Sequence, residues 1–252
     1  MKRDTRKLRF SDEVLGFVPA RGGSKSVPYK NLAPLGGWPL MRWVIEAGKE
    51  APSIGRVVCS TDDDRIAATA TDCGAEVIKR PPELAADDSP TIDSVIHVLD
   101  TLNEREGVMP WAVALLQPTS PFVLPGHVED SVAKLKSNKR LGSVQTVTKP
   151  PHNHHAFNQR IIDDEGVVRF RFLQQRKAAY NKQRKPSLYV FGNLATVRSS
   201  TLLRTYNVFP PLSYGIEIPA TYAIDVDAGD DFALAEWYLE TERVSLPFWS
   251  KP

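Results

Sequence analysis

The stretch VLGFVPARGGSKSVPYKN, residues 14–31, joins a short apolar run to a loop rich in glycine and cationic residues. The run at 14–18 predicts a buried β-strand, because uninterrupted apolar runs of this length are typical of strands covered on both faces. The loop that follows would lie at the carboxyl end of that strand, where open parallel sheets bind their ligands. We therefore expect a ligand-binding loop directly after the first strand.

This loop, PARGGSKSVPYKN at 19–31, has the composition of a phosphate-binding segment. Glycine lets backbone N–H groups approach a phosphate closely, and Lys and Arg neutralise its charge. The pattern is neither G-x-G-x-x-G nor G-x-x-x-x-G-K-[ST], so the dinucleotide fingerprint and the P-loop are excluded. A surface turn with incidental cations is the alternative. The residues expected to bind are Arg21, Gly22, Gly23, Ser24, Lys25, Lys30 and Asn31.

Strand and helix patterns alternate over the first 150 residues, which predicts βαβ units and a mostly parallel sheet. Pro39 is typical of a first helical turn, Thr61 of an N-cap and Gly74 of a helix end. Further strands are expected at 56–60, 75–78, 111–116 and 143–147, and helices at 39–50, 61–73, 91–105 and 127–136.

The alternation breaks after Thr148. Residues 149–157 (KPPHNHHAF) predict a loop, and 161–172, with DDEG in the middle, predict a β-hairpin. The core pattern resumes with an expected strand at 222–226 and a helix at about 230–240. We therefore expect one α/β domain over 1–252 that carries an inserted arm at about 149–195. Such an excursion from a compact core often serves oligomerisation.

Length and composition exclude several classes of protein. The chain has 252 residues, of which 42% are hydrophobic and 25% charged, so it is neither a long disordered protein nor a disulfide-dependent minidomain. We expect no membrane partner and no secretory signal, because apolar runs of about 18 residues are missing and the first residues, MKRDTRKLRFSDE, are charged. Cys59 and Cys73 form no CxxC pair and favour a reducing, cytoplasmic location.

Charge is unevenly distributed although the net charge is only +2. Residues 167–216 contain no Asp or Glu but nine Lys or Arg. This segment is either a solvated basic surface or a surface that meets an anionic group, such as an acidic sugar, a phosphate, a nucleic acid or an acidic face of a partner chain.

An acidic pair lies near the end of the chain, in AIDVD at 223–227. On a strand the carboxylates of Asp225 and Asp227 would point the same way, while Ile224 and Val226 would point into the core. Two such carboxylates suit Mg²⁺ or Mn²⁺, hard cations that bridge to substrate phosphates. A solvated strand end is the alternative, and the phosphate-type loop at the other end of the chain favours the metal site.

Five motifs together resemble a known family, the cytidylyltransferases that activate nine-carbon acidic sugars. These include the CMP-sialic acid synthetases and the CMP-legionaminic and CMP-pseudaminic acid enzymes, and the CMP-KDO synthetases look more distant. The likeness covers about residues 14–240. The motifs, in order, are PARGGSKSVPYKN (19–31), STDD (60–63), RPPELAADDSPTID (80–93), LQPTSP (116–121) and YAIDVDAGDDF (222–232).

The resemblance implies a Rossmann-like, GT-A-like nucleotidyltransferase fold with an arm that swaps into a neighbouring subunit, giving a homodimer or a tetramer. It also implies a reaction in which CTP and a nonulosonic acid, a 2-keto-3-deoxy sugar acid, give a CMP-sugar and pyrophosphate. The anomeric hydroxyl attacks the α-phosphate in line, so the site has to supply positioning and charge neutralisation. A small-molecule enzyme of this kind binds no nucleic acid.

Carried over by position, the resemblance also assigns site residues. Arg21, Lys25 and Lys30 would contact the triphosphate, with Gly22 and Gly23 giving close backbone approach. Asn31 and Arg80 would hold the nucleotide, and Gln117 would hydrogen-bond the sugar near its reacting end. Asp225 and Asp227 would hold Mg²⁺, while Asp231 would be a residue of the helix start and not a ligand.

Two stretches of the sequence depart from the family pattern. Family members usually have Leu-Arg after QPTSP, and this chain has Phe122 and Val123. The strand that usually reads Asn-Gly-Ala, followed by Tyr, here reads GNL at 192–194 with Thr196 at the tyrosine position. These changes indicate a different nonulosonic acid or a weakened activity.

Other functions stay open. The interleaved aromatic and cationic residues of the arm would suit binding of single-stranded nucleic acid. The acidic pair argues against this function, because a nucleic-acid surface has no use for two carboxylates. A DxD glycosyltransferase is disfavoured by the loop after the first strand. A CMP-KDO-type synthetase and a non-catalytic nucleotide-binding paralogue are further alternatives. His152, His154 and His155 favour a loop or sugar contact over zinc, since no Cys or acidic residue is near them.

Overall fold

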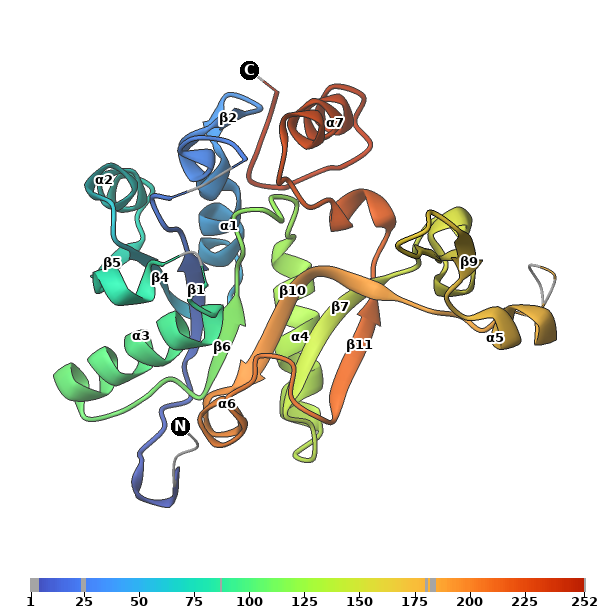
Figure 1. Cartoon of the computed structure of the whole chain (residues 1–252). Helices are drawn as coiled ribbons and strands as arrows, with labels where there is room; N and C mark the ends of the chain where they lie inside the picture. The colour runs from blue at the N-terminus through green and yellow to red at the C-terminus, as the bar shows by residue number, and fades with distance from the viewer. Residues whose placement is uncertain (1–4, 24–25, 87, 180, 182–184, 252) are drawn as a thin grey trace.

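A seven-stranded sheet forms the centre of the computed structural model, which describes residues 5–23, 26–86, 88–179, 181 and 185–251. The strand order is β11-β7-β10-β6-β1-β4-β5, and β10 alone runs antiparallel to its neighbours (Figure 1). The mostly parallel α/β sheet expected from the sequence is confirmed. The strands are β1 Val14–Pro19, β4 Ile54–Thr61, β5 Glu76–Lys79, β6 Ala112–Leu115, β7 Ser143–Thr148, β10 Val190–Arg198 and β11 Ser213–Glu217.

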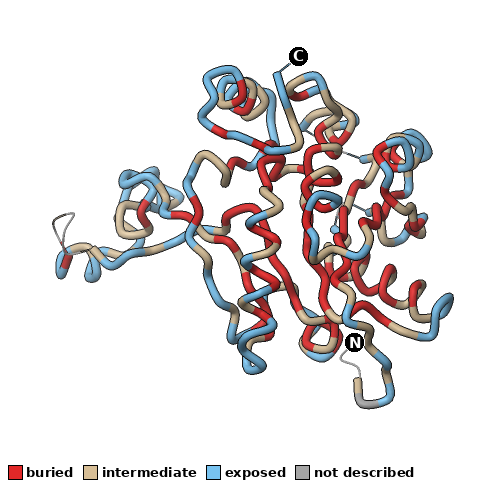
Figure 2. Tube along the Cα trace, turned by 180° about the vertical axis from the view of Figure 1, so that it is seen from behind, coloured by how far each residue is buried: buried red, intermediate tan, exposed pale blue. Residues whose placement is uncertain are grey.

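Helices cover both faces of this sheet because alternate residues of its strands point to opposite sides. Val14 and Val18 of β1 pack with buried residues of α1, α2 and α4, whereas Leu15 and Phe17 pack with α3 and α6. Figure 2 shows the buried residues concentrated along the strands and the helix faces turned toward them. The helices are α1 Leu40–Lys49, α2 Asp64–Asp72, α3 Thr91–Glu106, α4 Pro125–Ser137, α5 Leu173–Ala178, α6 Ser199–Thr205 and α7 Gly229–Glu240.

The C-terminal part of the chain returns to pack on the N-terminal part. Trp43 of α1, Phe122, Ile224, Val226 and Leu239 of α7 belong to one buried apolar cluster. The short pair β2 Pro34–Leu35 and β3 Trp38–Pro39 adds Leu35 to it. This cluster holds the segment with the acidic pair over the carboxyl ends of the strands.

Two local expectations are wrong. Residues 222–226 are not a strand: η7 Ala220–Ala223 is a 3₁₀ helix, and the extended chain after it crosses above the sheet with a main-chain bond from Val226 N–H to the Thr119 carbonyl (2.7 Å). The cap of α2 is Asp63 and not Thr61, because Thr61 still belongs to β4 while Asp63 Oδ1 accepts from Arg65 N (2.8 Å) and Ile66 N (3.1 Å).

The arm leaves the sheet after β7 and returns at β10, so its expected end at 195 lies inside a core strand. Residues 193–197 are buried between β7 and β6, which makes them part of the sheet. The expected hairpin is confirmed as β8 Arg160–Ile162 paired with β9 Val168–Phe170. The presumed loop at 149–157 contains the 3₁₀ turn η4 His152–His154, and η5 Ala156–Asn158 begins in it. Figure 1 shows the arm projecting sideways from the core.

Within the described ranges, no helix combines the length and apolar character that a membrane crossing requires.

Strand β10 contains an irregularity opposite Thr146. Phe191 pairs with Val147 and Ala195 with Gln145, so four steps along β10 match two along β7. A Cβ at Gly192 would lie 2.6 Å from Thr146 Oγ1 and 2.9 Å from the Thr146 carbonyl carbon. Only glycine allows this approach of the two backbones.

We expect Gly192→Ala to destabilise the fold by about 1–3 kcal/mol, the usual cost of overpacking a tightly packed interior. Urea unfolding followed by circular dichroism measures this change. Gly126→Ala is the matched control, since Gly126 lies in α4 and a Cβ there meets no atom within 4 Å. An unchanged unfolding midpoint for Gly192→Ala would show that the two strands separate easily.

Candidate active site

A cavity of about 560 Å³ opens where β1, β5 and β6 end. This is the edge of a parallel sheet at which ligands bind. The loop after β1, the segments after β5 and β6, and the start of α3 contribute its walls. The lining residues are Pro19, Arg21, Gly23, Ser26, Lys30, Asn31, Arg80, Ser89, Thr91, Ser94, Gln117, Pro118 and Thr119.

The loop after β1 is held by its own polar groups. Asn31 Nδ2 donates to the Arg21 carbonyl (3.0 Å), and Arg21 Nη1 donates to the Ala86 carbonyl (3.1 Å). Gly22 N–H donates to Asp62 Oδ1 (3.0 Å), and a Cβ there would lie 2.9 Å from Asp63 Cβ. Glycine is thus needed at 22 for the approach to α2, while Gly23 lines the cavity. The expected ligands Ser24 and Lys25 lie outside the described residues.

Arg80 places a buried cation at the cavity wall. Its Nη2 donates to the Ser60 carbonyl (2.9 Å), its Nε to Ser60 Oγ (3.2 Å) and its Nη1 to the Leu84 carbonyl (3.4 Å). Burial lowers the pKa of this guanidinium from its ordinary value. The acceptors of these three bonds are neutral, and the nearby carboxylate of Asp62 interacts favourably with the guanidinium charge.

The acidic segment at 223–227 contacts the loop after β1, although the two are far apart in the sequence. Lys30 Nζ forms an ion pair with Asp227 Oδ1 (2.5 Å), and Ser26 Oγ donates to the Asp227 carbonyl (2.5 Å). Asp231 Oδ2 accepts from the N–H groups of Asp227 (2.9 Å) and Ala228 (2.7 Å). Asp231 is therefore a helix-start residue, as expected, and the loop after β1 meets a segment about 200 residues further along the chain.

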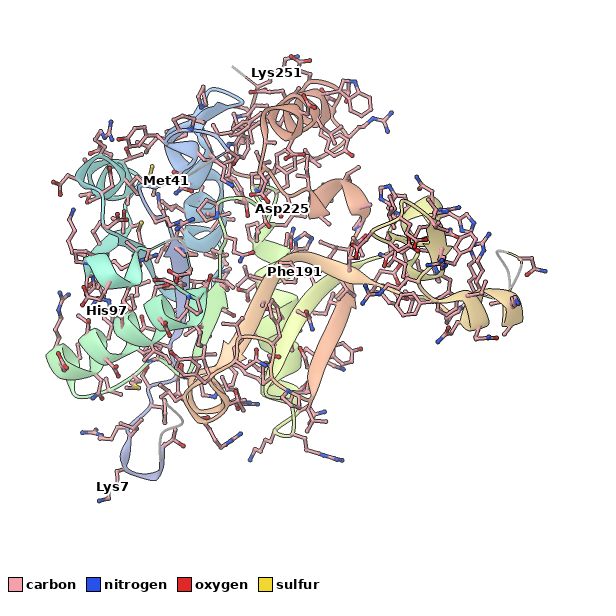
Figure 3. All side chains as sticks on the ribbon, viewed as in Figure 1. Lys7, Met41, His97, Phe191, Asp225 and Lys251 are labelled. Carbon is pink, nitrogen blue, oxygen red and sulfur yellow. The ribbon has the colours of Figure 1, made fainter. Side chains whose placement is uncertain are left out.

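The two carboxylates keep the alternation expected of a strand although no strand forms. Ile224 and Val226 are buried, and Asp225 and Asp227 are exposed. Figure 3 places Asp225 between α7 and the upper end of the sheet. Loss of solvation around its carboxylate raises the pKa of Asp225; a hydrogen bond with Thr119 opposes this, and the charge of Asp227 adds to it.

The acidic pair suits a hard cation that is shared with a substrate. In the described ranges, no group of three or more His, Cys, Asp or Glu could hold a metal ion by protein ligands alone. Mg²⁺ typically binds one or two carboxylates and completes its shell with water and phosphate oxygens. The donor set of Asp225 and Asp227 fits that mode.

The structure brings most of the expected residues to one cavity. Arg21, Gly23, Lys30, Asn31, Arg80 and Gln117 line it. Asp227 reaches it through Lys30, and Gly22 turns away from it.

The sequence reasoning missed Ser89, Thr91 and Ser94, whose hydroxyl groups come from the start of α3. Hydroxyl residues three apart in a predicted first turn are the signal that could have revealed them.

The first departure from the family pattern replaces charge by packing. Phe122 and Val123 are fully buried, and Phe122 meets the Trp43 ring edge-on at 6.0 Å between centroids. An arginine at 123 would have to enter the apolar core. Position 123 therefore contributes to the apolar core and supplies no cation.

Comparison with known proteins gives consistent relatives. The family model described as Cytidylyltransferase matches residues 15–227. The N-acylneuraminate cytidylyltransferase of Escherichia coli O18:K1:H7 is 29% identical over 223 residues, which are 88% of this chain and 51% of that protein. The CMP-N,N'-diacetyllegionaminic acid synthase of Legionella pneumophila is 30% identical over 237 residues, 92% of this chain and 99% of that protein. The chain thus spans about half of the first relative and nearly all of the second.

Solved structures share the fold at low sequence identity. A CMP:2-keto-3-deoxy-manno-octonic acid synthetase, described as complexed with CTP, superposes with a TM-score of 0.67 at 15% identity and covers 91% of this chain and 99% of its own. A 4-diphosphocytidyl-2C-methyl-D-erythritol synthase from Anaerococcus prevotii gives 0.60 at 13%, covering 91% of this chain and 99% of its own. The expected nucleotidyltransferase-like fold is confirmed.

Proposed function

The chain belongs to the cytidylyltransferase family, and we propose that it transfers the cytidylyl group of CTP to a nonulosonic acid, a nine-carbon 2-keto-3-deoxy sugar acid, with release of pyrophosphate. The observation that carries the proposal is the joining of Lys30 and Asp227 beside a cavity at the carboxyl ends of the sheet. That contact links the loop after β1 to the acidic segment, which supports one site formed from both. The relatives named for N-acylneuraminate and diacetyllegionaminic acid support the sugar class.

The chemistry requires no covalent enzyme intermediate. The anomeric hydroxyl oxygen of the sugar forms a bond to the α-phosphorus, the bond from that phosphorus to the bridging oxygen breaks, and pyrophosphate leaves as the hydroxyl proton is released. The protein has to orient the two reactants and neutralise charge. In this proposal Arg21 and Lys30, which line the cavity, neutralise the triphosphate, and Arg80 binds the nucleoside end.

The sugar hydroxyl would meet Gln117, which follows β6 on the opposite wall of the cavity. Asp225 and Asp227 would hold Mg²⁺ or Mn²⁺, which when bound polarises the α-phosphate. Because Asp227 pairs with Lys30, the two carboxylates would lie next to the cations that we assign to the triphosphate.

We extend the proposal to a homodimer formed through the arm, here residues 149–189. Ile162 is 71% exposed and Val168 55% exposed on the β8–β9 hairpin, an unusual apolar content for a projecting hairpin. Arg169 and Arg171 are exposed on the same hairpin or directly after it. A second copy would cover the apolar residues and receive cations near its sugar site. A tetramer would need a further interface.

A cytoplasmic location belongs to the same proposal. Both Cys59 and Cys73 are free and buried, a state that a reducing compartment maintains.

The activity is tested by pyrophosphate release from CTP with a panel of sugar acids: sialic, deaminated sialic, legionaminic, pseudaminic and the eight-carbon KDO. We expect one nine-carbon acid to exceed KDO by at least about tenfold in kcat/KM, a difference of about 1.4 kcal/mol in transition-state binding. ATP and GTP should be poor substitutes for CTP. Equal turnover with the purine nucleotides, or no pyrophosphate with any acid, would refute the proposal.

Asp227→Asn should leave the fold intact and lower kcat by about 10²–10³-fold, as expected on loss of a major electrostatic ligand. Stability should change little, because the side chain of Asp227 is 64% exposed and such ion pairs contribute at most about 1 kcal/mol. EDTA should abolish turnover, and Mg²⁺ or Mn²⁺ should restore it.

Asp230→Asn is the matched control for this variant, since Asp230 is an exposed carboxylate in the first turn of α7. Near-normal turnover of Asp227→Asn, or turnover that is independent of metal, would make the acidic pair structural.

The arm is tested by sedimentation at micromolar concentration. Ile162→Asp should convert a dimer to a monomer and lower turnover, because a charge would be buried in the proposed interface. Leu212→Asp, at a side chain that is 64% exposed outside the arm, should do neither. A wild-type monomer with full activity would overturn this part of the proposal.

A further inference from the structure

A buried amide lies behind the acidic segment. Asn193 of β10 is fully buried, and its Nδ2 lies within hydrogen-bond distance of the Tyr222 carbonyl (2.9 Å), the Phe122 carbonyl (3.1 Å) and His127 Nδ1 (3.2 Å). This residue is part of the second departure from the family pattern. It does not line the cavity, so its effect on the site has to pass through its partners.

Thr146 fixes the orientation of this amide. Its Oγ1 accepts from the backbone N–H groups of Asn193 (2.8 Å) and Leu194 (2.9 Å) and donates to Asn193 Oδ1 (3.0 Å). Gly192 permits the close approach that these bonds require. With Oδ1 directed to Thr146, the two hydrogens of Nδ2 face the carbonyls of Phe122 and Tyr222.

Those two carbonyls belong to the two segments that carry the expected chemistry. Phe122 ends the loop that begins at Gln117, and Tyr222 precedes Asp225 by three residues. The same segments are joined by the bond from Val226 N–H to the Thr119 carbonyl. Asn193 therefore provides a second tie between them, at a place where neither segment belongs to the sheet.

The surroundings of the amide are uncharged at neutral pH. Burial lowers the pKa of His127 to about 4, so the ring is neutral. Its Nδ1 accepts from Leu124 N–H (3.3 Å), and its ring meets the Tyr222 ring edge-on at 5.7 Å. The Phe122 carbonyl is buried and the Tyr222 carbonyl partly buried, so the loss of their shared donor would leave polar groups without a partner at a cost in stability.

We propose that Asn193 is a positioning residue: by donating to the Phe122 and Tyr222 carbonyls it holds the Gln117 loop and the Asp225–Asp227 segment at the separation that the transfer step requires. This inference rests on the proposed function. It gives the Gly-Asn departure a role in the geometry of the acidic pair and not in sugar contact.

The test replaces Asn193 by Leu, a side chain of similar size without a donor. We expect the Val226 amide to exchange with deuterium at least about tenfold faster, because the segment loses one of its ties to the core. In the transfer reaction, kcat should fall by about 10–100-fold while KM for CTP stays within about threefold, since the cations that hold the triphosphate lie on another loop.

Thr196→Val is the matched control. Thr196 is buried on the same strand, and its Oγ1 hydrogen-bonds Ser131 Oγ (2.6 Å) away from the acidic segment. It should lower the unfolding midpoint without changing Val226 exchange or kcat. If Asn193→Leu does not fold, Asn193→Ala takes its place, because its smaller side chain leaves room for water at the two carbonyls.

Two outcomes would overturn the proposal. One is an unchanged rate of amide exchange at Val226 in the Asn193 variant. The other is that Thr196→Val lowers kcat and speeds Val226 exchange as much as the Asn193 variant does. The exchange measurement needs no turnover. If the wild-type protein makes no CMP-sugar, the proposed function fails, and faster Val226 exchange confined to the Asn193 variant still establishes the tie.

Discussion

The packing of the C-terminal segment on α1 is the constraint that assembles this site. The segment with Asp225 and Asp227 forms no strand, so the sheet does not hold it by a hydrogen-bond ladder. Burial of Ile224 and Val226 contributes about 1.5–3 kcal/mol for each side chain. The Lys30–Asp227 ion pair, with its exposed carboxylate, contributes at most about 1 kcal/mol. Apolar burial therefore contributes more than the ion pair to holding the C-terminal segment against the N-terminal part of the chain.

The cations of the cavity are arranged for charge that comes with a substrate. Arg80 donates to neutral acceptors, and the charge of Asp62 offsets part of the loss of solvation of its guanidinium. An anionic or electron-rich ligand would complete its surroundings. Lys30 is paired, but its partner belongs to the acidic segment, and phosphate oxygens could compete for the same ammonium group. The site holds positive charge in place before the ligand arrives, which is how a preorganised site lowers a barrier.

Local patterns gave the parallel part of the fold and most of the cavity. The apolar run at 14–18, the glycines and cations after it, and the alternation of Ile224, Asp225, Val226 and Asp227 each depend on few neighbours, so sequence reveals them. Strand β11 was missed because its region was judged by its basic, acid-free composition, which also fits an arm, and β10 was expected only at 192–194, through the family resemblance. The prediction of a strand at 222–226 was wrong for a related reason. Buried and exposed residues do alternate there, but whether the segment joins a sheet depends on its tertiary contacts, here the turn after Pro219 and the bond to the Thr119 carbonyl.

The departures at 122–123 and 192–194 change the site in different ways. At Val123 the family pattern leads one to expect a cation, and the chain has a fully buried apolar side chain there. At Asn193 a buried amide ties that wall to the acidic segment, which changes geometry and adds no charge. A sugar acid bound near Gln117 would still need a cation for its carboxylate. Among the described residues that line the cavity, the cations are Arg21, Lys30 and Arg80, and the proposed function assigns the first two to the triphosphate. Under the proposed function, exposed cations of the arm such as Arg171, presented by a second copy, would supply that charge, which links the change at Val123 to the proposed dimer.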